Sequence, residues 1–83
     1  MDINIKTIFG DMNVVVDNSY TIKEVIMMVV KNFGLHPRGH YAIGKQNHIF
    51  VEFAQNRTLG ECSIKENDVL VLTDYGRCDG KEM

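Results

Sequence analysis

The 83-residue chain has few of the residues that build disulfide-stapled or membrane-spanning proteins. It has two cysteines, Cys62 and Cys78, one proline and no tryptophan. Two cysteines sixteen positions apart make no disulfide framework, so we expect both to be free thiols in a reducing compartment. No apolar run approaches the roughly 20 residues that span a bilayer. We therefore expect a soluble, unexported, cytoplasmic protein without a membrane span.

The chain also lacks a basic block or an arginine-rich stripe. Nine Lys and Arg residues stand against eleven Asp and Glu residues, which gives a formal net charge of −2 and a pI near 5.8. Such a chain cannot neutralise many phosphates, so we expect no nucleic-acid partner. The length suits one domain and leaves no room for a second domain or for a large buried active site.

Alternating apolar and polar residues predict a β-hairpin at the start of the chain. Residues 1–8 alternate, with Ile3 and Ile5 on the buried face, and residues 12–16 repeat the alternation after a glycine turn at residues 9–11. A period of two is typical of a strand with one face in the core and the other in water.

A single amphipathic helix is predicted to begin after Thr21. Thr21 and Glu24 have the spacing of a capping box, and Gly34 supplies the left-handed residue that ends a helix. Apolar residues recur between them at helical spacing. These residues are Ile22, Val25, Ile26, Val29, Val30 and Phe33. By the same spacing, Met27 and Met28 are expected to face solvent.

The second half of the chain predicts another hairpin and a last strand. Residues 41–43 form a short apolar run, residues 44–47 a turn, and residues 48–53 a second β-rich run. Residues 69–72 are all apolar, which suits a strand in the middle of a sheet, parallel to the first strand. The order of elements predicts an α+β roll in which one helix covers one mixed sheet.

No residues assemble a recognisable catalytic or metal site. Residues 39–46 have P-loop spacing, but Gln46 replaces the magnesium-binding Ser or Thr and a β-rich run follows, so a strand with a glycine turn is the better interpretation. His36 and His40 straddle a proline and do not share a helical face, and Cys62 has no nearby histidine or CxxC partner. We predict no metal, no cofactor and no enzymatic activity.

The pattern resembles ubiquitin and its relatives of the β-grasp fold over nearly the whole chain. Three segments carry the resemblance: Lys6-Thr7 with Gly10 in the first turn, Thr21-Ile22 at the helix start, and Arg57-Thr58-Leu59 followed by Ile64-Lys65-Glu66. The resemblance implies a sheet of four to five strands packed on one α-helix, with a domain at residues 1–74 and a flexible C-terminal tail at residues 75–83. Several extra residues between Gly44 and Arg57 look more like the first lobes of FERM domains and Ras-association-type domains.

The resemblance further implies a protein-binding patch on the exposed face of the sheet. Ile8 matches a leucine of that patch, whereas Ala42, Val71 and Thr73 fall near its isoleucine, histidine and valine, so the patch is smaller and rearranged. Val69 joins it as an apolar residue that the core does not explain. We predict a docking surface that consists of Lys6, Ile8, His40, Ala42, Val69 and Val71.

The expected function is that of a non-catalytic ubiquitin-like protein-protein interaction domain. It would be a monomeric adaptor, or the N-terminal module of a larger cytoskeletal or signalling protein. One alternative is a ubiquitin-like modifier processed near Gly76, although Tyr75 stands where modifiers need a slim residue before their terminal glycine. Another is a domain that binds Ras-family small GTPases through Lys6 and Lys23.

Overall fold

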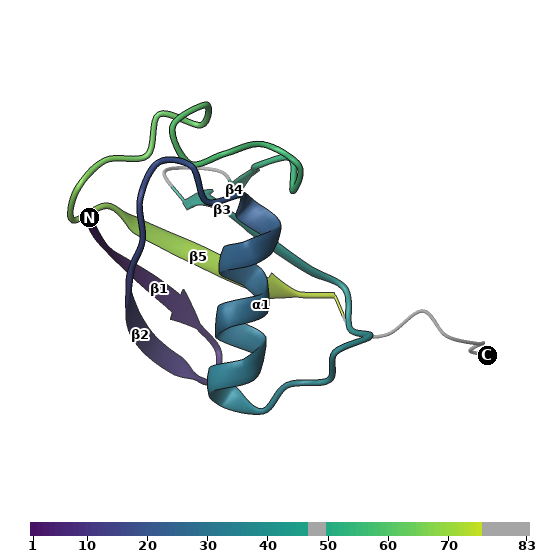
Figure 1. Cartoon of the computed structure of the whole chain (residues 1–83). Coiled ribbons are helices and arrows are strands. Elements are labelled where there is room, and N and C mark those ends of the chain that lie inside the picture. Colours follow the sequence, from purple (N-terminus) through teal and green to yellow (C-terminus); the bar gives the residue numbers. More distant parts are fainter. Residues whose placement is uncertain (47–49, 76–83) are drawn as a thin grey trace.

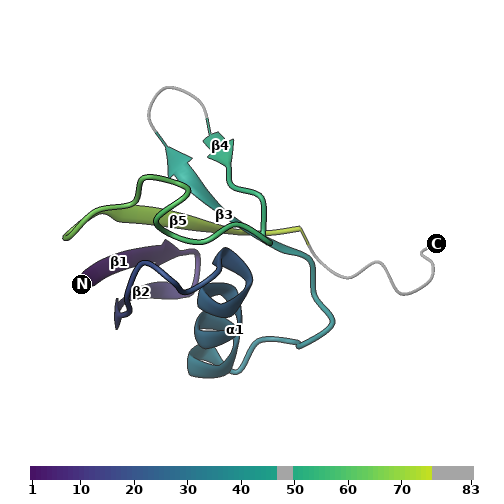
Figure 2. The same ribbon diagram turned by 45° about the horizontal axis from the view of Figure 1, so that its top comes forward.

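The computed structural model describes residues 1–46 and 50–75, in which five strands and one helix follow one another along the chain (Figure 1). Their bounds are β1 Asp2–Thr7, β2 Gly10–Val15, α1 Ile22–Phe33, β3 Tyr41–Gln46, β4 Phe50–Glu52 and β5 Val69–Asp74. The strands form one mixed sheet in the order β2-β1-β5-β3-β4. Figure 2 shows α1 lying against one side of this sheet, which is the predicted α+β roll.

The centre of the sheet pairs the first strand with the last. β1 and β5 run parallel, with Ile5 opposite Leu70, as the apolar run at residues 69–72 predicted. β5 also pairs antiparallel with β3, where Ile43 lies opposite Leu72. All four of these side chains are buried, because they project from the face of the sheet that α1 covers.

The first turn lies slightly earlier than predicted. Thr7 pairs with Gly10 across the β1–β2 hairpin, so Ile8 and Phe9 form its two-residue loop. The Thr7 hydroxyl explains this position, since it accepts the Phe9 N–H at 2.9 Å and donates to the Gly10 carbonyl at 2.8 Å.

The helix begins and ends where the sequence predicted. The Thr21 hydroxyl accepts the Glu24 N–H at 3.1 Å, and the Glu24 carboxylate accepts the Thr21 N–H at 2.8 Å. Gly34 ends α1 with φ +65, a left-handed conformation. Met27 faces solvent as expected, but the prediction for Met28 is wrong: it is half-buried and packs against the core. Its long, flexible side chain lies at the edge of the apolar stripe and can reach the core.

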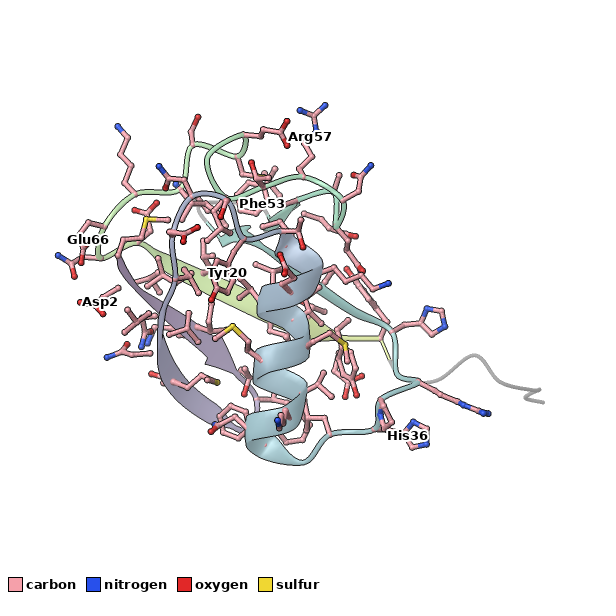
Figure 3. The ribbon with its side chains drawn as sticks, in the orientation of Figure 1. Asp2, Tyr20, His36, Phe53, Arg57 and Glu66 are labelled. Carbon is pink, nitrogen blue, oxygen red and sulfur yellow. The ribbon has the colours of Figure 1, made fainter. Side chains whose placement is uncertain are left out.

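Residues outside the strands and the helix pack against one end of the core. Tyr20 and Phe53 pack against the core near the end where α1 begins (Figure 3). At the edge where β1 begins, the Asp2 N–H donates to the Glu66 carboxylate at 3.0 Å, and the two side chains lie near each other in Figure 3. Within residues 1–46 and 50–75, no helix has the length and apolar character needed to cross a membrane.

The predicted turn at residues 44–47 is wrong in its first three positions. β3 continues through Gly44 to Gln46 and pairs with β4, with Gly44 opposite Glu52. Glycine is needed there for close strand approach, because an added Cβ would lie 2.1 Å from the Val51 carbonyl oxygen. Asn47, His48 and Ile49 of the predicted hairpin lie outside the described residues.

Candidate protein-binding surface

The face of the sheet that α1 leaves uncovered carries most of the predicted site. Side chains alternate between faces along a strand, so the neighbours of the buried Leu70 and Leu72 project away from the helix. The register places Lys6 opposite Val71. It also places Ala42 opposite Thr73, one strand further along the sheet.

A shallow hollow of about 390 Å³ lies on this face where the β1–β2 turn meets β5, and we call it the sheet-face hollow. Its lining residues come from two segments of the chain: Lys6, Thr7, Ile8, Val71, Leu72, Thr73 and Asp74. Ile8 is the most prominent apolar group, since 84% of its surface is exposed. A large aliphatic side chain held in water beside a hollow is a common feature of docking surfaces.

The structure brings three of the six predicted residues together in the sheet-face hollow: Lys6, Ile8 and Val71. Val69 lies two positions before Val71 on the same strand and face, is 49% exposed and lies outside the hollow. Ala42 is only 1% exposed, so little of it can touch a partner.

His40 is separated from the others. It precedes β3, its carbonyl accepts the Tyr75 N–H at 2.7 Å, and it lines a different hollow beside α1. Sequence reasoning also missed Asp74 in the sheet-face hollow, because the predicted last strand stopped at Leu72 while β5 continues to Asp74. The β-branched Thr73 directly after the apolar run was the sequence signal that the strand continues.

The turn that carries Ile8 is anchored from behind. The Phe9 ring lies 6.5 Å from the Phe33 ring, centroid to centroid, and so ties the turn to the last residue of α1. Together with the two Thr7 hydrogen bonds, this contact restricts the positions that the turn can adopt. The loop that carries Ile8 is therefore held in place, while the Ile8 side chain itself is exposed to solvent.

The charge next to the sheet-face hollow is largely balanced. The Lys6 ammonium lies 3.1 Å from the Asp11 carboxylate across the β1–β2 pair, and both side chains are exposed. Such a surface pair contributes little stability, but it neutralises the cation that an acidic partner would need. The hollow is thus suited to apolar contact more than to charge recognition.

The described residues contain no group of three or more His, Cys, Asp or Glu side chains that could hold a metal ion. His36 accepts the Arg38 N–H at its Nδ1 atom, 3.0 Å away.

Cys62 is half-buried, and this burial raises the pKa of its thiol. A raised pKa keeps the sulfur protonated and weakly nucleophilic at neutral pH. Gly76 and Cys78 lie outside the described residues.

Comparison with known proteins assigns the fold. No protein-family model and no curated protein matches the sequence. A chain of the solved structure titled "Crystal Structure of pParkin-pUb-UbcH7 complex" is similar over 89% of this chain, with a TM-score of 0.71 and 27% identity. This chain covers 22% of that chain, about a fifth of its length. Parkin has a ubiquitin-like domain, and the five-stranded mixed sheet on a single helix is likewise an α+β ubiquitin-like fold.

Proposed function

We propose that this chain is a non-catalytic ubiquitin-like interaction domain that docks a partner protein at the sheet-face hollow. The observation that carries the proposal is the position of Ile8, exposed on a braced turn beside a hollow that Val71 and Thr73 also line. The domain would act as a cytoplasmic monomer, as an adaptor or as a module of a longer protein. The similarity of this chain to one part of a much longer solved chain supports the interpretation as a module of a longer protein.

Burial of apolar surface would supply most of the binding energy. Covering a side chain of the size of Ile8 contributes about 1.5–3 kcal/mol, because its methyl and methylene groups leave water. Val71 adds to this contact from the neighbouring strand. The low number of unpaired charges around the hollow predicts binding that changes little between low and physiological salt.

A matched pair of substitutions on one strand tests the site. Val71→Asp places a carboxylate inside the sheet-face hollow, whereas Val69→Asp places the same carboxylate on the same face outside it. Tagged wild type and both variants are used for native pull-down from the parent cells, with mass spectrometry of the bound proteins. Circular dichroism first shows that each variant is folded.

We expect Val71→Asp and Ile8→Asp to lose a discrete partner that wild type and Val69→Asp retain. Ile8→Asp gives an independent check, because Ile8 lies in a solvent-exposed turn and its replacement leaves the core intact. If all four proteins capture the same set of partners, the sheet-face hollow is not the docking site and the proposal fails.

The two alternatives give different results in simple assays. A modifier processed near Gly76 would lose residues 77–83 in cells and form adducts that survive denaturation. A binder of small GTPases would depend on the bound nucleotide and would be weakened by Lys6→Glu or Lys23→Glu. The ion pair of Lys6 with Asp11 makes the second alternative weaker, because that cation is already neutralised.

A further inference from the structure

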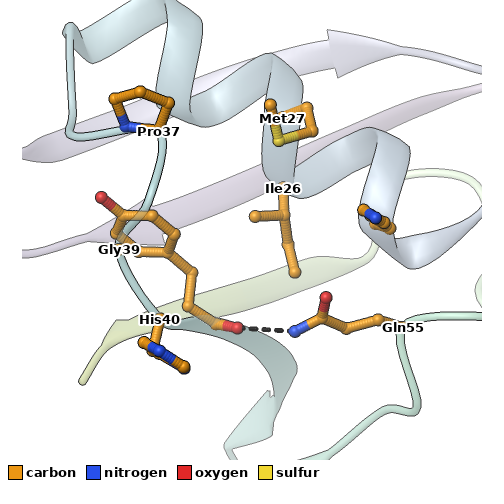
Figure 4. A pocket seen from close by; sticks show the side chains of 8 residues that line it. Ile26, Met27, Pro37, Gly39, His40 and Gln55 are labelled. Carbon is orange, nitrogen blue, oxygen red and sulfur yellow. Dashed lines mark hydrogen bonds between the residues drawn. The ribbon is translucent and has the colours of Figure 1, made fainter. Parts of the chain in front are cut away.

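A second hollow lies on the helix side of the molecule, and we call it the helix-side hollow (Figure 4). It has a volume of about 190 Å³ and lies between α1, the segment from α1 to β3, and the segment after β4. The residues that matter for its chemistry are Lys23, Ile26, Met27, Pro37, His40 and Gln55. The proposed docking residues Lys6, Ile8 and Val71 do not line it, because they lie in the sheet-face hollow.

Three hydrogen bonds join the walls of the helix-side hollow. The Lys23 N–H on α1 donates to the Gln55 carbonyl at 3.0 Å. The Gln55 side-chain amide donates to the Tyr41 carbonyl at 2.8 Å, which Figure 4 marks with a dashed line. The Tyr41 hydroxyl donates to the His36 carbonyl at 2.7 Å. Because each wall is bonded to the next, the hollow is formed before any ligand arrives, which lowers the entropic cost of binding.

The lining combines an apolar surface with one cation, the Lys23 ammonium, and with the polar ring of His40. Ile26 is nearly fully buried, whereas Met27 is 46% exposed and faces the same space as Pro37. No carboxylate lines the hollow, although the whole chain carries a net charge of −2. Within the described part of the chain, neither the Lys23 ammonium nor the His40 ring makes a hydrogen bond or an ion pair. A ligand that matches this lining is negatively charged and has an aliphatic portion.

We propose that the helix-side hollow binds an acidic segment of a partner polypeptide in which an aliphatic residue stands next to a carboxylate. The aliphatic side chain covers Met27 and Pro37, and the carboxylate interacts with Lys23 and His40 at the rim. Charge complementarity favours this occupant over a neutral apolar peptide, because only a carboxylate is attracted to the exposed ammonium. This site lies on the opposite side of the sheet from the proposed docking surface, so the domain can bind two partners at once.

Peptide titration followed by NMR tests the proposal on the whole chain. The probe is acetyl-Ala-Leu-Glu-Ala-amide, and its matched control has Gln in place of Glu. The variant Lys23→Gln removes the cation from the hollow, and Lys31→Gln removes the same charge from the last turn of α1, outside the hollow. Both substitutions lie on the solvent side of the helix, so both proteins are expected to fold.

We expect the Glu peptide to shift the amide signals of Met27, Gly39 and Gln55 and to bind about two- to fivefold more tightly than the Gln peptide. Lys23→Gln should abolish this difference, and Lys31→Gln should retain it. Equal binding of the two peptides to the wild type would overturn the proposal. Equal weakening of Glu-peptide binding by both variants would show a general charge effect and would also overturn the proposal. Signal shifts confined to Ile8 and Val71 would place the peptide in the sheet-face hollow and would overturn it as well.

Discussion

Gly44→Ala tests whether close contact between β3 and the edge strand β4 stabilises this end of the sheet. Gly44 lies in β3 opposite Glu52, and it is also opposite Val71 of the sheet-face hollow. An added Cβ would lie 2.1 Å from the Val51 carbonyl oxygen and 2.9 Å from the Glu52 Cα. The obstacle is backbone, so no rotation of a side chain can relieve it.

The size of the effect follows from these distances. A carbon and a carbonyl oxygen are normally about 3.3 Å apart or more, so β4 must move by about 1 Å. A shift of that size disrupts the ladder hydrogen bonds between β3 and β4, each with a net value of about 1 kcal/mol. We expect a loss of about 2–3 kcal/mol in the free energy of unfolding, the range typical of overpacked sites. A chain of 83 residues has a total stability on the order of 4–12 kcal/mol, so the variant stays folded but is clearly weakened.

Gly34→Ala is the matched control, because it adds the same methyl group where no atom lies within 4 Å. Its cost comes only from the left-handed backbone and is about 1 kcal/mol. Urea unfolding gives both free energies, and hydrogen exchange shows where protection is lost. We expect faster exchange at β3 and β4 amides in Gly44→Ala alone. If Gly44→Ala lies within about 0.5 kcal/mol of wild type and keeps its protection, the close-contact explanation is wrong.

Two further predictions concern local stability and pH. Thr21→Ala removes the acceptor for the Glu24 N–H and should lower the free energy of unfolding in urea by about 1 kcal/mol. Thr21→Ser keeps a hydroxyl and should retain most of that stability. Equal stability of the two variants would contradict the capping role. The Lys65 N–H, and secondarily the Lys45 ammonium at 3.2 Å, hold the pKa of Asp68 below 3.8. The lower pKa in the folded state means that Asp68 contributes stability above pH 3.8, and that this stability is lost as the pH falls toward the lowered pKa. Asp68→Asn should therefore flatten the fall of stability in this acid range, and an unchanged pH profile would refute the assignment.

The sequence by itself determined the features that depend on neighbours a few positions away. The start of α1 at Ile22 and its end at Gly34 follow from a capping box and a left-handed glycine, whose hydrogen bonds lie within five positions. The faces of β1 follow from alternation, which separates Ile3 and Ile5 from the residues that face water, whereas the all-apolar run at residues 69–72 predicted only that β5 is a central strand. These elements also led to the correct order of strands and helix along the chain and to the parallel pairing of the first and last strands.

Only the tertiary structure decided the features that depend on which distant segment lies beside a residue. Gly44 is a strand residue because it pairs with Glu52 and Val71, and it must be glycine because the Val51 carbonyl occupies the space of a side chain. Ala42 is buried, and His40 and Val71 line different hollows, and neither fact can be deduced from the residues next to them in the chain. A local pattern assigns a side chain to one face of its strand or helix. Whether that side chain is exposed, and which distant residues lie beside it, depends on how the strands and the helix pack together in the complete fold.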